Sequence, residues 1–278
     1  MPTVRPHLRG ARPSPAHKIF ATPKYHPGAV PEFFGVVPPE LSFWDNSQYG
    51  DCVSAEEAAA KAQFSLMFGG TTELFIPQDE VVSWASANGF LNGADLISVM
   101  DAMARSGMTA TDGRKYGDGP YQAVDWTNDA TLSSAIYQGP VKLAVAANQL
   151  DPVWSGHPEN GWIAIGFNPD QAIDHCVNLC GFGSLQELCD LLGVSVPSGQ
   201  DPTKRSYLMF TWSTIGIIDR SSMMAITAEA YVRLPTTVVQ SAKPPKHQAP
   251  PTASGPSSPK TVDDLKMILS GVLGLLNK

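Results

Sequence analysis

The local patterns along this chain change from helical to strand-like near residue 140, and this order limits the folds available to it. Residues 53–67 are rich in alanine and carry apolar residues at helical spacing, which predicts a buried helix beginning at or just after Cys52. Two more helices are expected over residues 93–108 and 128–139. Short β-rich segments follow at 140–147, 172–183, 207–212 and 228–234. Helices first and strands afterwards predict an α+β domain that keeps the two kinds of structure apart.

The two ends of the chain have a different composition from its centre. Residues 1–40 are rich in proline and lack periodicity, which predicts an extended N-terminal arm. We place the folded domain at residues 41–238 and a proline and serine linker at 239–260. Residues 261–278 then form an amphipathic helix, opened by Thr261 and Asp264 at capping-box spacing. That helix either docks on its own domain or, like the arm, binds protein partners in a larger assembly.

Charge and hydropathy exclude several classes of protein. The net charge of −7 and a pI near 5.3 argue against a nucleic-acid binder. No stretch has the apolar length of a signal peptide or a membrane span, so we expect a cytoplasmic or virion-associated protein. The segments GGTTE and GFGS lack the lysine of a phosphate-binding loop. We therefore expect no nucleotide and no other cofactor.

The position of Cys52 admits two interpretations. At a helix N-terminus the unpaired backbone N–H groups and the helix dipole favour the thiolate, which is the nucleophilic form. A cysteine beside an apolar helix also packs well as a small core residue. The reactive interpretation needs a base, and His175 is the one histidine of the six that falls within a predicted strand.

The segment HCVNLC raises the question of a zinc site. Side chains alternate along a strand, so His175 and Val177 share one face whereas Cys176 and Cys180 share the other. Zinc ligands must converge on one point. We therefore expect Cys176, Cys180 and Cys189 to pack, with a metal site as the alternative.

Several motifs, taken in order, resemble those of the papain-like cysteine peptidases. They are a cysteine opening an early helix, then GPVKLAV, then DHCVNLCGFG, then YLMFTWSTIG. The similarity covers most of the central domain, and it is greatest to divergent bacterial and phage proteins that carry a YGDC sequence. It implies a papain-like α+β fold, with a helical half and an antiparallel β half.

The resemblance also implies roles for particular residues. Cys52 matches the nucleophile and His175 the base that holds it as a thiolate. Asn46 stands where the family has the glutamine of the oxyanion hole. Trp212 stands where the family has the asparagine that orients the histidine. Thr211 or Ser213 takes that role after a shift of one residue, or Trp212 shields the imidazole.

Two functions remain open at this stage. One is a cysteine peptidase or amidase that acts on a peptide substrate through an acyl-thioester on Cys52. The other is a weakly active or inactive papain-like module that serves as a structural or binding protein of a multi-subunit particle, such as a phage virion.

Overall fold

The computed structural model describes residues 8–67 and 74–234, and it confirms the α+β class. In these residues an eight-stranded sheet has the order β6-β12-β7-β9-β10-β11-β8, with β2 beside β9. Its pairs are antiparallel except for β11 and β8. The strands of this sheet are β2 (Phe34–Gly35), β6 (Tyr121–Ala123), β7 (Val141–Val145), β8 (Ile163–Ala164), β9 (His175–Ser184), β10 (Arg205–Thr211), β11 (Thr214–Asp219) and β12 (Thr227–Arg233).

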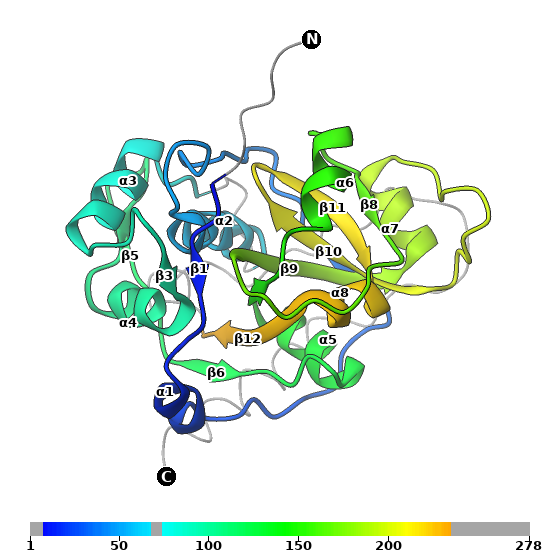
Figure 1. Cartoon of the computed structure of the whole chain (residues 1–278), viewed down its shortest axis with the longest axis horizontal. Coiled ribbons are helices and arrows are strands. Elements are labelled where there is room, and N and C mark those ends of the chain that lie inside the picture. Colours follow the sequence, from blue (N-terminus) through cyan, green and yellow to red (C-terminus); the bar gives the residue numbers. More distant parts are fainter. Residues whose placement is uncertain (1–7, 68–73, 235–278) are drawn as a thin grey trace.

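Helices cover both faces of this sheet, and four short strands complete the helical half. Figure 1 shows α3 and α4 on the left, the large sheet on the right and α2 between them. The helices are α1 (Ala16–Ala21), α2 (Cys52–Met67), α3 (Gln78–Ala87), α4 (Leu96–Ser106), α5 (Asp129–Gln138), α6 (Leu150–Gly156), α7 (Leu185–Leu192) and α8 (Arg220–Ile226). The short strands are β1 (Ala11–Arg12), β3 (Ala94–Asp95), β4 (Met108–Thr109) and β5 (Lys115–Tyr116).

Most of the predicted elements are confirmed. Helix α2 begins at Cys52, and α5 is capped by Asn128. Helix α7 begins with a capping box, in which Ser184 and Glu187 each hydrogen-bond to the other's backbone. The structure adds α3, α6, α8 and β11, which the sequence did not predict. Helices α6 and α8 have seven residues each, too few for a clear period.

Strand β9 contributes to two hydrophobic cores, one on each side of the sheet. Cys176 and Cys180 lie in the core shared with α2, α3 and α4. Val177 and Leu179 lie in the core shared with α5, α6 and α8. The predicted alternation along this strand is therefore confirmed, and it places consecutive residues in different environments.

The described part of the N-terminal arm, residues 8–40, lies against the domain. It contains the short helix α1, and β2 at its end pairs with β9 of the large sheet. The predicted linker at 239–260 and helix at 261–278 lie outside the described residues. Within residues 8–67 and 74–234, no helix combines the length and apolar character needed to cross a membrane.

A cluster of fully buried charges joins α2 to the sheet. Glu56 accepts hydrogen bonds from Lys142 on β7 at 2.6 Å and from Arg233 on β12 at 2.7 and 2.9 Å. Glu57 pairs with the same two cations at 2.5 and 2.7 Å. On the next turn of α2, Lys61 pairs with Asp118. Three carboxylates thus face three cations, and all six side chains have no exposed surface.

The electrostatic balance of this cluster is visible in the pKa of Glu57. Burial alone would raise that pKa, but the charges of Arg233, Lys142 and Lys61 hold it below its usual range. Removing one partner from such a group leaves a buried charge without compensation.

We expect Glu56→Ala to destabilise the fold by about 3–5 kcal/mol, because it leaves Lys142 and Arg233 with one carboxylate between them. Urea unfolding followed by circular dichroism measures this change. The matched control is Lys18→Ala, which removes a half-exposed ion pair with Asp101 at 3.2 Å and should cost less than about 1 kcal/mol. Equal losses in the two variants would show that the buried cluster does not hold α2 in place.

Candidate active site

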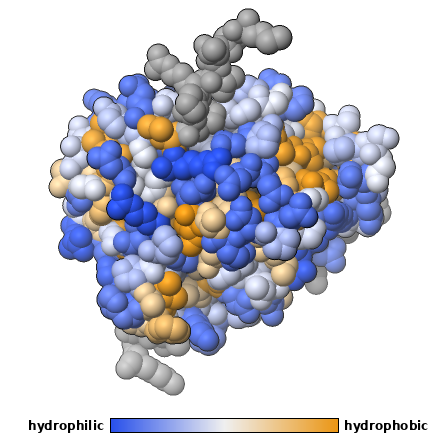
Figure 2. Space-filling model, viewed as in Figure 1, coloured by the Kyte–Doolittle hydropathy of each residue, from blue (hydrophilic) through white to orange (hydrophobic). Residues whose placement is uncertain are grey.

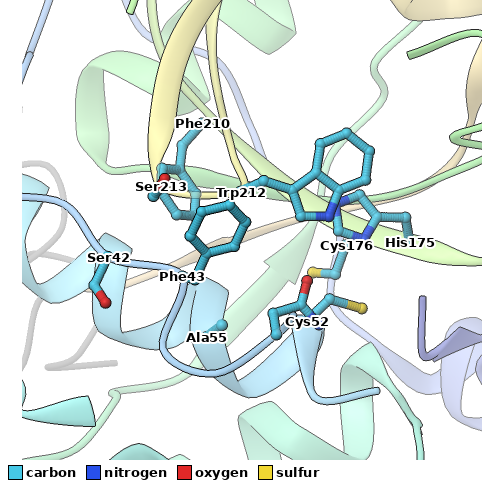
Figure 3. Close-up of a pocket in the computed structure, with 10 residues that line it drawn as sticks. Ser42, Phe43, Cys52, Ala55, His175, Cys176, Phe210, Trp212 and Ser213 are labelled. Atoms are coloured by element: carbon cyan, nitrogen blue, oxygen red, sulfur yellow. The ribbon is translucent and has the colours of Figure 1, made fainter. Parts of the chain in front are cut away.

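Cys52 and His175 line the same small pocket, where the start of α2 meets the sheet. The other lining residues come from the loop before α2, from α2 itself and from strands β9 and β10 with the turn after β10: Ser42, Phe43, Asn46, Ala55, Cys176, Phe210, Trp212 and Ser213. Figure 3 shows both cysteine sulfur atoms beside the imidazole of His175. The pocket leaves about 10 Å³ of space for water, which is room for one molecule.

The local sequence places Cys52 at the first position of its helix. The carbonyl oxygen of Asp51 accepts hydrogen bonds from the backbone N–H groups of Ser54 at 2.8 Å and Ala55 at 3.0 Å, which starts the first turn. Cys52 therefore lies at the positive end of the helix dipole, as predicted. Its side chain is only 2% exposed.

Burial dominates the acidity of this thiol. Burial raises the pKa of Cys52 to about 11, whereas hydrogen bonds from the backbone of Gly10 and Cys176 act to lower it. The helix terminus was expected to favour the thiolate, but removal of the thiol from water outweighs that effect here. In this arrangement Cys52 is protonated at neutral pH.

The imidazole of His175 is held by a hydroxyl group. His175 is the first residue of β9, and its Nε2 lies 2.8 Å from Oγ1 of Thr211 at the end of β10. When Nε2 carries the proton and donates to Thr211, Nδ1 is the basic nitrogen of the ring. Thr211 thus makes the contact that the sequence left open between three neighbouring residues.

Trp212 lies flat against the imidazole. The two rings stack with centroids 4.4 Å apart and an angle of 18° between their planes (Figure 3). Trp212 and Ser213 form the two-residue turn between β10 and β11, at φ values of 43° and 71°. Residues other than glycine, asparagine and aspartate rarely adopt this left-handed conformation. The strained turn places the indole over His175, so Trp212 shields the imidazole ring.

Asn46 lies at the pocket, but its amide is engaged within its own loop. The Nδ2 group donates to the carbonyl of Tyr49 at 3.1 Å and to Oδ1 of Asp51 at 3.4 Å. The two residues before it, Trp44 and Asp45, also have positive φ values. A role for Asn46 in binding an oxyanion remains a prediction, since the amide must first turn away from one of these partners.

Asp51 is a buried acid that the sequence analysis did not single out. Burial raises its pKa to about 7, although the hydrogen bond from Asn46 acts to lower it. A carboxyl group with this pKa changes its charge near neutral pH directly beside Cys52. In the sequence, Asp51 is recognisable only as an aspartate directly before the cysteine. No local pattern indicates that this loop is buried.

The N-terminal arm crosses the site and covers Cys52. Arg9 forms ion pairs with Asp151 and, at 2.5 Å, with Asp174, the residue before His175. The carbonyl of Gly10 accepts a hydrogen bond from Ala94 at 2.9 Å, and β1 continues beside β3. In Figure 1 this segment runs in front of α2, between the helical half and the sheet, and Figure 2 shows hydrophilic side chains over the middle of the same face.

The arm fits the site closely at Gly10. A Cβ atom on Gly10 would lie 1.7 Å from the carbonyl oxygen of Gly50, so no larger residue fits where the arm now lies. Gly50 stands two residues before Cys52. The backbone of the arm therefore touches the loop that carries the candidate nucleophile.

The cysteines are free thiols. Cys180 lies away from His175 as predicted, but Cys176, which was also expected to face away from His175 and only to pack, lines the same pocket as His175. Cys52, Cys176, Cys180 and Cys189 are all buried. In the part of the chain that the structure describes, no group of three or more histidine, cysteine, aspartate or glutamate side chains is placed to hold a metal ion.

The structure brings all four predicted site residues, Cys52, His175, Asn46 and Trp212, to one pocket. The sequence analysis missed the contribution of Asp51, and it did not identify Gly10 as the residue of the arm that meets the loop before Cys52. No local pattern indicated this contact, since Gly10 and Gly50 are 40 positions apart.

Comparison with known proteins connects this geometry to one fold. Neither a protein-family model nor a curated protein matches the sequence. Solved structures do match. The cysteine protease xylellain from Xylella fastidiosa superposes with a TM-score of 0.56 at 13% identity, covering 84% of this chain and 99% of that one. Bromelain from Ananas comosus gives 0.54 at 12% identity, covering 74% and 100%, and procathepsin L 3 from Tenebrio molitor gives 0.54 at 14%, covering 76% and 73%. This chain therefore has the fold of the papain-like cysteine proteases.

Proposed function

We propose that the protein is a papain-like cysteine hydrolase, a peptidase or amidase, whose N-terminal arm holds the active site closed. The observation that carries this proposal is the pocket shared by Cys52, at the start of α2, and His175, whose imidazole is oriented by Thr211. A nucleophile, a base and a group that orients the base are the parts that nucleophilic catalysis requires. Xylellain and bromelain, described as cysteine proteases, share the fold.

The chemistry follows from the roles of these side chains. With the arm displaced, His175 takes the proton of Cys52, and the thiolate attacks the carbonyl carbon of a peptide or amide. The backbone N–H of Cys52, together with the amide of Asn46, stabilises the oxyanion that forms. His175 then protonates the leaving amine, and water hydrolyses the acyl-thioester.

The closed state accounts for the high pKa of Cys52. The arm excludes water from the thiol, and burial is the largest cause of the shift to about 11. Displacing the arm exposes the thiol to water and to a substrate. The thiol should then titrate at or below the ordinary value for cysteine, about 8.5, because the helix terminus and His175 both favour the thiolate.

A second candidate function is supported by the same burial. A papain-like module that keeps the arm in place permanently would serve as a structural or binding protein, with protein partners bound by the arm and by residues 261–278. The fully covered thiol and the internal hydrogen bonds of Asn46 favour this candidate. A multi-subunit particle such as a phage virion is the assembly we propose for it.

Gly10→Ala separates the two candidates, because the added methyl group cannot fit against Gly50 and must displace the arm. We expect alkylation of Cys52 by iodoacetamide at pH 7 to accelerate at least a hundredfold, since each unit of pKa changes the thiolate fraction about tenfold. Mass spectrometry of the Cys52 peptide gives the rate. The same variant should hydrolyse a mixture of fluorogenic peptides, and Cys52→Ser in that background should not.

The matched control is Gly28→Ala, also in the arm, where the new Cβ would meet only Oγ of Ser134 at 3.9 Å. Its labelling should equal that of the wild type. Adding His175→Ala to Gly10→Ala should abolish the fast labelling at low pH. If it persists, or if the open variant hydrolyses no peptide, the hydrolase proposal fails and the second candidate stands.

Thr211→Val tests the hydroxyl that orients the imidazole, while keeping the volume of the side chain. In the Gly10→Ala background we expect it to lower kcat and the alkylation rate below pH 7 roughly tenfold or more, because loss of a buried hydrogen bond costs about 1–3 kcal/mol. Thr211→Ser retains the hydroxyl and should restore both rates. An unchanged pH profile in Thr211→Val would show that Thr211 only packs against the ring.

A further inference from the structure

Cys176 lies at the active site without a role in the proposed reaction. It follows His175 directly, and the alternation of β9 turns its side chain to the opposite face, towards α2. It lines the same pocket as Cys52 and is 3% exposed. Figure 3 shows its sulfur atom next to that of Cys52, with both sulfurs on the α2 side of the imidazole.

The pKa values of the two thiols agree with this placement. A hydrogen bond from the backbone of Cys176 acts to lower the pKa of Cys52, and a charge on Cys52 acts to raise the pKa of Cys176. The first residue of α2 and the second residue of β9 thus lie at one small pocket.

This proximity is specific to one pair of cysteines. Cys180 lies on the same face of β9 but four residues further along, which is about 13 Å at the rise of a strand. Its sulfur lies 4.0 Å from the carbonyl of Leu208. Cys189 lies on α7, the helix that follows the C-terminal end of β9, and it does not line the pocket.

The surroundings of Cys176 keep it as the protonated thiol of the pair. Burial raises the pKa of Cys176 well above its usual value, and although the ammonium group of Lys142 acts to lower it, Glu56 and Glu57 act to raise it. Lys142 also donates a hydrogen bond to the carbonyl of Val53 at 2.9 Å, so this cation is fixed beside the first turn of α2. This cation acts on the thiol of Cys176, so a negative charge that develops on that sulfur as it attacks is stabilised.

We propose that Cys52 and Cys176 form a reversible disulfide when hydrogen peroxide reaches the open enzyme, and that this bond protects the nucleophile from further oxidation and stops its reaction with substrate. The thiolate of Cys52 attacks the peroxide, which breaks the O–O bond and gives a sulfenic acid and hydroxide. The thiol of Cys176 then attacks the sulfenic sulfur and releases water. In total two thiols lose two electrons and two protons, and one peroxide becomes two water molecules.

The modification requires that the arm has moved away from Cys52. While Gly10 covers Cys52, the thiol is protonated and buried, so peroxide reacts slowly with it. The proposal rests on the proposed function, because it takes Cys52 to be the reactive thiol once the arm is displaced. The bond itself needs no turnover, so it can be measured without a substrate.

The test compares Gly10→Ala with Gly10→Ala/Cys176→Ser, with Gly10→Ala/Cys180→Ser as the matched control. Each protein is treated with hydrogen peroxide, blocked with iodoacetamide and digested without reductant, and the peptides are identified by mass spectrometry. With Cys176 present, we expect a linked peptide that joins Cys52 to Cys176 and a full return of Cys52 alkylation after dithiothreitol. The Cys180→Ser control should behave in the same way.

Without Cys176, Cys52 should advance to the sulfinic acid, which dithiothreitol does not reduce. Absence of the linked peptide, whatever the state of Cys52, overturns the proposal. Equal recovery of Cys52 with and without Cys176 overturns it as well. A failure of the hydrolase proposal is measured separately, because it appears as a lack of peptide hydrolysis before any peroxide is added.

Discussion

The buried pairing of two glutamates on α2 with a lysine and an arginine on the sheet holds this structure together at its centre. Glu56 and Glu57 reach Lys142 on β7 and Arg233 on β12, and no atom of these four side chains is exposed. Charges removed from water are stable only when all of them are paired in good geometry. The helix therefore has one acceptable depth and rotation against the sheet, whereas an apolar interface would tolerate small shifts.

This charge cluster also limits where the residues of the candidate active site can lie. Cys52 lies one turn before Glu56 on the same helix, and Lys142 also holds the carbonyl of Val53. His175 and Asn178 belong to β9, and Asn178 donates to Glu56 at 3.0 Å. Both partners of the proposed Cys and His pair are thus fastened to one charge cluster, which limits how far they can move apart.

A strained turn and the N-terminal arm enclose the rest of the site. The left-handed turn at Trp212 and Ser213 places an indole against His175, a conformation that only the surrounding packing sustains. The arm then covers the thiol, and its Arg9 binds Asp151 and Asp174, the residue before His175. In the proposed function, the covered thiol is protected from alkylation and oxidation until the arm moves. In the proposed disulfide, Cys176 protects the same sulfur atom after the arm has moved.

By itself the sequence determined the α+β class, the helix that begins at Cys52, and the alternation that places Cys176 and Val177 in different cores. These features depend on residues close together in the chain, through helical period, capping and the pleat of a strand. It also brought Asn46 and Trp212 into the candidate site through an ordered set of motifs. Only the tertiary structure decided that Thr211 holds the imidazole, that Gly10 covers Cys52, and that Glu56 meets Arg233. Those contacts join residues 36, 42 and 177 positions apart, and no local pattern records which distant groups meet when the chain closes.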